Sequence, residues 1–160
     1  MSKVKNDYDI KDHDGSTVGL KLGGTLVTAT AAELNTVDGL TATATELNET
    51  FIGTFIADLT AEATHYMVMP HAGSITKIWS VTNGSVATAD ITLTFNIGAV
   101  AITNGVVTIA TAGSAAGDVD SATPTAANVV TAGAAINFVV TGGGAGGTPA
   151  GHITVVLTRT

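Results

Sequence analysis

Apolar and polar residues alternate with a period of two through much of the chain after residue 57. Ile91, Leu93 and Phe95 fall on one face of an extended segment, whereas Thr92 and Thr94 fall on the other. Successive side chains of a strand point to opposite sides, so this pattern is typical of strands with one buried face. The alternation predicts strands at His65–Met69, Ser74–Val81, Ile91–Ile97, Val106–Ala110, Ile136–Val140 and His152–Leu157.

Turn signals divide these segments. Asn104-Gly105 separates two apolar runs, and this dipeptide favours a type I′ hairpin turn. Between Thr111 and Asn128 small and acidic residues replace the alternation, which predicts a long connection that crosses the sandwich or reaches a neighbouring subunit. Short strands with Gly-rich turns predict a mainly β fold, with a C-terminal β-sandwich or jelly roll.

Residues 28–53 contain a tandem repeat of 13 residues. The triplet Glu33-Leu34-Asn35 recurs in register as Glu46-Leu47-Asn48. Each unit has the Thr-x-x-Glu spacing of a capping box, in which the Thr and Glu side chains satisfy the first free amides of a helix. Each repeat therefore predicts a helix of one to two turns that Asn ends.

Helices this short are marginal in water, because few hydrogen bonds follow a costly nucleation step. Each repeat also carries too little apolar surface to fold alone, which favours burial against copies of itself around a symmetry axis. We therefore predict a self-associating stalk, with a solvated Ala/Thr linker as the alternative. Its predicted oligomer interface is Leu34, Val37, Leu40, Leu47, Phe51 and Ile52.

The first 25 residues predict a hairpin arm. Tyr8–Lys11 and Thr17–Leu22 flank the turn His13-Asp14-Gly15, and an Asp-Gly pair between apolar runs is a hairpin signal. The arm contains four of the chain's six basic residues, so it carries mixed charge. The predicted organisation is an arm at 1–25, the repeat at 26–56 and the sandwich domain at 57–160.

Two segments resemble phage structural proteins. The phrase Val27-Thr-Ala-Thr-Ala-Ala-Glu-Leu-Asn35, with Val37-Asp-Gly39, is similar to the TAAELN-type repeats of tailed-bacteriophage fibre and head-associated proteins. Residues 66–160 resemble the β-sandwich of phage head fibre and capsid decoration (cement) proteins. The segments behind the second resemblance are 69–77, 87–90 and 112–124.

The resemblance implies a virion protein on the capsid exterior, made in the cytoplasm of a bacterial host. Its implied partners are the major capsid protein and further copies of itself, as a homotrimer. A mixed-charge arm is suited to docking on a capsid surface, with a frayed terminus as the alternative. The predicted docking residues are Lys3, Lys5, Tyr8, Ile10 and Lys11.

Composition removes several other classes of function. The net charge of −7 disfavours nucleic acid as a partner, because phosphate binding requires clustered cations. The chain has no cysteine, which excludes disulfides, thiol catalysis and Cys-based zinc sites. No apolar run reaches the length of a signal-peptide core or the roughly 18 residues that span a bilayer, so we expect no membrane partner.

Candidate chemistry is sparse. Asp12-His-Asp-Gly15 is similar to part of a calcium loop, but the order of ligands fails, so a solvated hairpin is favoured over a weak ion site. Gly142–Gly147 satisfies G-x-G-x-x-G, yet Pro149 and another strand follow it, where the nucleotide fingerprint needs a helix. Asp118 and Asp120 are two residues apart in a segment of small residues, which indicates that their carboxylates are solvated or bind an ion.

The remaining candidates also favour a structural role. His13, His65, His71 and His152 have no nucleophile elbow beside them, and partly exposed strand ends are favoured over a metal on a trimer axis. Trp79, the single tryptophan, is predicted in the core or as an interface anchor. We therefore predict no enzyme, no cofactor and no metal site. The alternatives are a fibre or adhesin module for host glycan or protein and, more remotely, a carbohydrate-active enzyme.

Overall fold

The computed structural model describes residues 21–22, 25–26, 47–144 and 147–160. The chain divides into two compact units, Met1–Thr41 and Ala42–Thr160. In the first unit, strand β1 (Lys21–Leu22) pairs antiparallel with β2 (Thr25–Leu26). Leu22 thus pairs with Thr25, whereas the rest of the predicted hairpin at 8–20 lies outside the described residues.

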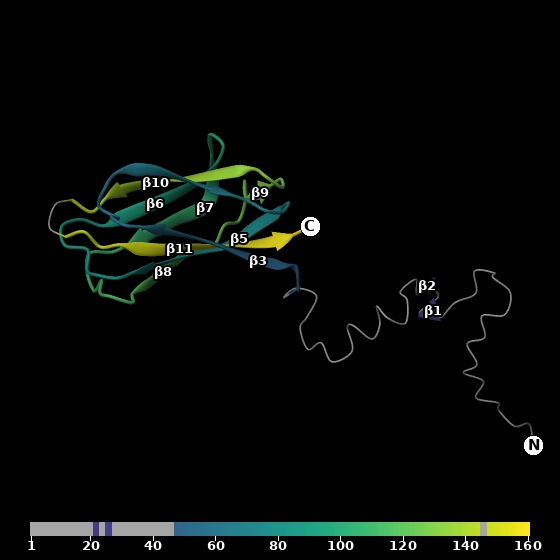
Figure 1. The fold of residues 1–160 in the computed structure, drawn as a ribbon, viewed down its shortest axis with the longest axis horizontal. Coiled ribbons are helices and arrows are strands. Elements are labelled where there is room, and N and C mark those ends of the chain that lie inside the picture. Colours follow the sequence, from purple (N-terminus) through teal and green to yellow (C-terminus); the bar gives the residue numbers. More distant parts are fainter. Residues whose placement is uncertain (1–20, 23–24, 27–46, 145–146) are drawn as a thin grey trace, which may run out of the picture. The chain divides into compact units, whose positions relative to one another are not determined.

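The second unit consists of two antiparallel sheets (Figure 1). In spatial order, the four-stranded sheet contains β4 (Ala63–Val68), β10 (Ala135–Gly142), β6 (Ile91–Ile97) and β7 (Val100–Ile109). The five-stranded sheet contains β3 (Glu49–Ile56), β11 (Gly151–Arg159), β5 (Gly73–Thr82) and β8 (Val119–Ala122), and β9 (Val129–Val130) also pairs with β5. The mainly β prediction is confirmed as two antiparallel sheets.

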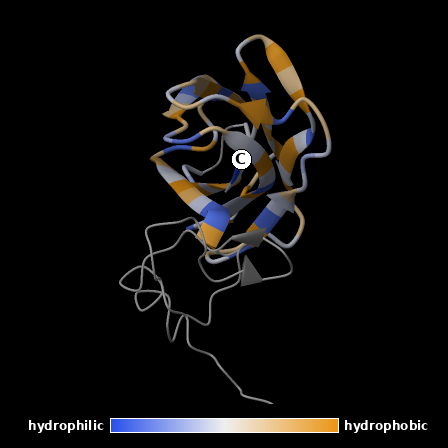
Figure 2. Ribbon diagram, turned by 90° about the vertical axis from the view of Figure 1, so that its right-hand side faces the viewer, coloured by the Kyte–Doolittle hydropathy of each residue, from blue (hydrophilic) through white to orange (hydrophobic). Residues whose placement is uncertain are grey.

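One hydrophobic core lies between the sheets. Phe95 of β6 and Phe138 of β10 are fully buried and stack with ring centroids 4.8 Å apart. Ile78 of β5 and Val155 of β11 reach the same cluster from the five-stranded sheet. Bands of high and low hydropathy alternate along the strands (Figure 2), as expected where each strand buries one side.

All six predicted strands are present, and Ile91–Ile97 has the predicted ends. The boundary predicted at residue 57 is wrong, because β3 (Glu49–Ile56) pairs along its whole length with β11. Residues 49–56 therefore belong to the sandwich and not to a segment before it. Apolar side chains occur on both sides of β3, so the alternation that revealed the other strands is missing there.

The predicted hairpin turn at Asn104-Gly105 is wrong. The β6–β7 turn lies at Gly98-Ala99, since Ile97 pairs with Val100. Asn104 does take a positive φ of 57°, but inside β7, where the register with β6 shifts. There Thr103 pairs with Ala126 instead. Because of this tertiary contact, the Asn-Gly pair forms an irregularity within the strand and not a hairpin turn.

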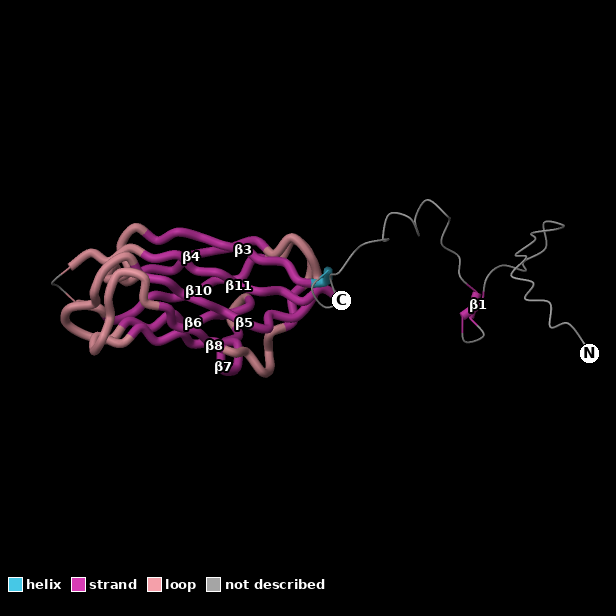
Figure 3. The backbone as a smooth tube through the Cα atoms, turned by 90° about the horizontal axis from the view of Figure 1, so that it is seen from below, coloured by secondary structure: helices cyan, strands magenta, loops and turns pink. Residues whose placement is uncertain are grey.

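The connection after β7 crosses from one sheet to the other, which is the first of the two predicted alternatives. The chain leaves the four-stranded sheet at Ile109 and enters the five-stranded sheet at Val119, as β8. Strands run the length of the sandwich and most loops gather at its two ends (Figure 3). The broad outer surfaces are therefore made of strand residues, in rows that the register defines.

Candidate interaction surface

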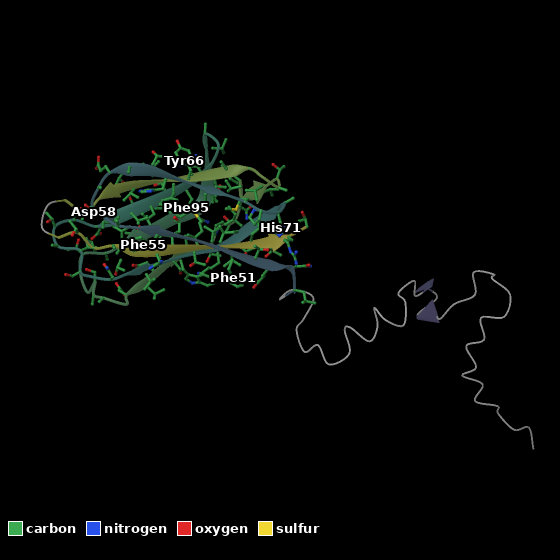
Figure 4. All side chains as sticks on the ribbon, in the orientation of Figure 1. Phe51, Phe55, Asp58, Tyr66, His71 and Phe95 are labelled. Carbon is green, nitrogen blue, oxygen red and sulfur yellow. The ribbon has the colours of Figure 1, made fainter. Side chains whose placement is uncertain are left out.

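Strand β3 is an edge strand with two exposed aromatic side chains. Phe51 is 62% exposed and Phe55 is 55% exposed. Their neighbours Ile52 and Ile56 point the other way and pack in or against the core. The alternation within β3 therefore places Phe51, Gly53 and Phe55 on the outer face of the five-stranded sheet (Figure 4).

A row of residues crosses that outer face from Phe55. Phe55 pairs with His152 of β11, which pairs with Val81 of β5, which pairs with Val119 of β8. The rings of Phe55 and His152 contact each other, with centroids 4.9 Å apart. Val119 at the far end of the row is 59% exposed. This row thus continues the apolar surface of β3 across the sheet.

Two further rows complete the face. Phe51 pairs with Val156, which pairs with Lys77, and the Lys77 Nζ donates a hydrogen bond of 3.0 Å to Thr123 Oγ1. Trp79 lies in the row between, partly buried, and its neighbours in the chain, Ile78 and Ser80, point inward. It is therefore not a core residue. We call Phe51, Phe55, Trp79, Val81 and Val119 the apolar face.

The outer face of the four-stranded sheet carries polar and apolar side chains side by side. Thr92 and Thr141 share a hydrogen bond of 2.6 Å, and Asn96 Nδ2 donates to Asn137 Oδ1 at 3.1 Å. Tyr66 of the edge strand β4 pairs with Asn137 and is 71% exposed. Val68 and Val106 are 63% and 45% exposed on the same outer face, so both outer surfaces carry apolar side chains among polar ones. The two exposed phenylalanines of the described chain lie on the five-stranded sheet.

The segment that leads into β3 is held against the end of β11. Leu47 and Asn48 are helical, and they lie beside the C-terminal residue in Figure 3. The Arg159 guanidinium donates a hydrogen bond through Nη2 to the Leu47 carbonyl oxygen. Leu47 itself is 50% exposed, although its backbone is fixed to the sandwich.

A polar depression lies at the same end of the sandwich. Asn48, His71 and Arg159 line it, together with Ala72, Ala132 and Thr160. The Arg159 Nε is buried and has no hydrogen-bond partner within the described part of the chain. The depression therefore adjoins the point where the predicted repeat meets the sandwich.

The predicted acidic pair occupies one end of β8. The Asp118 carboxylate accepts a hydrogen bond of 3.1 Å from the Val119 amide. Burial, and then the nearby charge of Asp118, raises the pKa of Asp120. Asp120 pairs with Ser80 of β5, and among the described residues neither Asp120 Oδ2 nor the buried Ser80 Oγ has a partner.

The described histidines lie apart from one another. His65 is partly buried within β4 and stacks on Phe138 at 5.2 Å, and its Nε2 has no hydrogen-bond partner in the described chain. His152 contacts Phe55, and His71 lines the polar depression. Within residues 47–144 and 147–160, no three His, Cys, Asp or Glu side chains gather as metal ligands would.

The Gly-rich segment joins the two sheets. Gly142 ends β10, and Gly142 and Gly144 line an open depression with Thr60, Glu62 and Ala89. Strand β11 follows the segment, as the sequence indicated. The formal G-x-G-x-x-G match is therefore followed by a strand, where a dinucleotide-binding fingerprint requires a helix.

The predicted site residues fall into three groups. Leu47 and Phe51 are exposed, so their predicted role at an oligomer interface stays a prediction. Ile52 packs against the core of its own chain, which accounts for part of its apolar surface. The remaining residues lie outside the described part of the chain: Leu34, Val37, Leu40, Lys3, Lys5, Tyr8, Ile10 and Lys11.

Three residues of the apolar face were not among the predicted site residues: Phe55, Val81 and Val119. Phe55 has a local signal, because it repeats the outward position of Phe51 four residues later. Val119 has none, since only the pairing of β8 with β5 brings it to this face.

Comparison with known proteins leaves the family open. No family model matches the chain, and no curated protein matches it either. In the residues that the structure describes, no helix is long and apolar enough to cross a membrane. The resemblance to phage repeats and phage sandwiches therefore stays a prediction.

Proposed function

We propose that this chain is a virion structural protein that binds the outer surface of a phage capsid as a homotrimer and decorates the head. In this proposal the sandwich is a jelly roll and the partners are the major capsid protein and the chain's own copies. The chain is not an enzyme and uses no cofactor. The tandem repeat that runs directly into β3 is the observation that carries the proposal.

The arrangement of the described residues supports self-association. The second repeat spans residues 41–53 and the sandwich begins at Glu49, so the end of the repeat is itself the start of β3 and no spacer separates them. The Arg159–Leu47 hydrogen bond joins the backbone at this junction to the last strand of the domain, β11. If the repeats of several copies pack symmetrically, their sandwiches would therefore take symmetric positions as well.

Decoration would work through several weak contacts made at once. Each copy contributes one arm, with Lys3, Lys5, Tyr8, Ile10 and Lys11 docking on the capsid. Linking weak contacts in one molecule raises the overall affinity by about 10² to 10⁴ over a single contact. Capsid subunits bridged in this way would separate only if several arms were released together.

Co-sedimentation with capsids tests this proposal. Purified full-length protein is mixed with undecorated capsids of its own virus, beside a Tyr8→Asp/Ile10→Asp variant. We expect saturable binding by the unchanged chain and a loss of binding of about tenfold or more in the variant, since two apolar contacts are lost from every arm. Equal binding by both would remove the arm from the interface.

A second candidate is an adhesin module that binds a host glycan. The observation in its favour is Tyr66, an exposed ring in the same cross-strand row as Asn137 and Asn96 on the outer face of the four-stranded sheet. Aromatic rings with neighbouring polar groups provide an apolar body and a hydrogen-bonding tip for such ligands. Failure of both chains to bind capsids, together with a positive glycan array that Tyr66→Ala abolishes, would favour this function.

A further inference from the structure

We propose that the apolar face is where a second copy of this chain packs, so that the sandwiches as well as the repeats hold the oligomer together. This inference rests on the proposed homo-oligomer. It names a surface of the sandwich domain, on the five-stranded sheet around Phe51 and Phe55 (Figure 4).

The length of chain between the repeat and this face limits where a copy can lie. Leu47, a predicted stalk residue, precedes Phe51 by only four positions. An extended chain rises about 3.3 Å per residue, so these two residues are at most roughly 14 Å apart. Arg159 also holds the Leu47 carbonyl against β11. If Leu47 meets its copies at a symmetry axis, each Phe51 lies within roughly 14 Å of that axis.

The charge of this face favours a copy of the same chain as the occupant. The chain carries a net charge of −7, so a surface that packs against its own copy must avoid an excess of carboxylates. By register, Glu49 and Lys77 are the charged carboxylate and amine on the outer side of the described five-stranded sheet. They lie in adjacent rows and have opposite sign. Two copies can therefore approach here without an excess of like charge.

The size of the apolar face is suited to a contact that supplements the one between the repeats. An aromatic side chain offers about 150 to 250 Å² of surface, so the exposed parts of Phe51 and Phe55 amount to roughly 200 Å². A stable interface buries about 800 Å² per partner. The apolar face therefore adds to the contact that the repeats make and does not replace it.

The dissociation constant of the full-length oligomer tests the inference. The variant is Phe51→Asp/Phe55→Asp, and the matched control is Tyr66→Asp/Val68→Asp, which alters two exposed residues on the edge strand of the other sheet. We expect the dissociation constant to rise roughly tenfold or more in the variant, because buried aromatic contacts dominate interfaces. The control should stay within about twofold of the unchanged chain.

A cross-link provides the second measurement, and it decides the question if the Asp variant fails to fold. The chain has no cysteine, so Phe51→Cys and Tyr66→Cys each create a single thiol. Equivalent residues of symmetric copies approach each other only near the axis. We expect a short bismaleimide to join chains through Phe51→Cys and not through Tyr66→Cys.

The outcomes separate this inference from the proposed function. The inference is overturned if Phe51→Asp/Phe55→Asp and the control have the same dissociation constant and Phe51→Cys gives no cross-linked product. In that case the proposed homo-oligomer still stands. An unchanged chain that is monomeric at every concentration overturns both.

Discussion

At the scale of single residues, Gly142 shows how closely two strands meet. Its φ is 90°, and a Cβ at this position would lie 2.1 Å from the Asp90 carbonyl oxygen. Gly113 has a similar φ of 87° but open space around it. The two positions therefore separate the cost of the backbone conformation from the cost of the steric clash.

We expect Gly113→Ala to lower the free energy of unfolding by about 1 kcal/mol, the cost of a left-handed backbone at a residue with a Cβ. Gly142→Ala should lower it by about 3 kcal/mol, because the strands must also move apart. Urea unfolding followed by circular dichroism measures both. Equal midpoints for the two variants would show that the close approach to Asp90 is absent in solution.

Asp120 predicts a pH dependence of stability. Burial raises its pKa in the folded chain above the value in the unfolded chain, so its ionisation opposes folding. This destabilisation is present above the folded pKa and disappears as the pH falls through the unfolded value near 3.8. Asp120→Asn should therefore stabilise the protein at pH 7 and have a smaller effect near pH 3.

Asp58 provides the control of opposite sign. Hydrogen bonds from the Thr60 hydroxyl and amide lower the pKa of Asp58, so its ionised form favours folding. Asp58→Asn should destabilise the protein at pH 7, and the effect should fade as the pH falls through the folded pKa. Thermal unfolding between pH 3 and pH 7 distinguishes the two carboxylates. Shifts of the same sign would contradict the assignment.

At the scale of elements, strict alternation is what made a strand predictable. Ile91–Ile97 was predicted to the residue because Ile91, Leu93 and Phe95 are fully buried and the intervening threonines face outward. Strand β7 was predicted only in part. The Asn104-Gly105 turn signal is local, whereas the pairing of Thr103 with Ala126 depends on a segment more than 20 residues away. Local preference cannot reveal such a contact.

Strand β3 explains why the candidate surface was only partly predictable. Phe51 was singled out as an apolar contact, but so was Ile52, which packs on the other side of the same strand. A strand with apolar residues on both faces gives no signal of which side is buried. Val119 could be added only from the register of β8, which no nearby residue indicates.

At the scale of the whole molecule, the account rests on symmetry. The described sandwich has its own core, yet it presents two exposed phenylalanines next to a repeat that is too small to fold alone. Both features have one explanation if copies of the chain meet at the repeat and at the apolar face. Oligomerisation would then add a stability that rises with the logarithm of the protein concentration.

The mass of the intact, unmodified chain in solution tests this central claim most directly. Native mass spectrometry, beside a Leu34→Asp/Leu47→Asp variant, should give three times the chain mass of 15.9 kDa for the unmodified protein and a single chain mass for the variant. Both should keep the circular dichroism of a β protein, since Leu47 is 50% exposed and position 34 is outside the described sandwich. A single chain mass for the unmodified protein at every concentration, or an unchanged oligomer in the variant, would contradict the account.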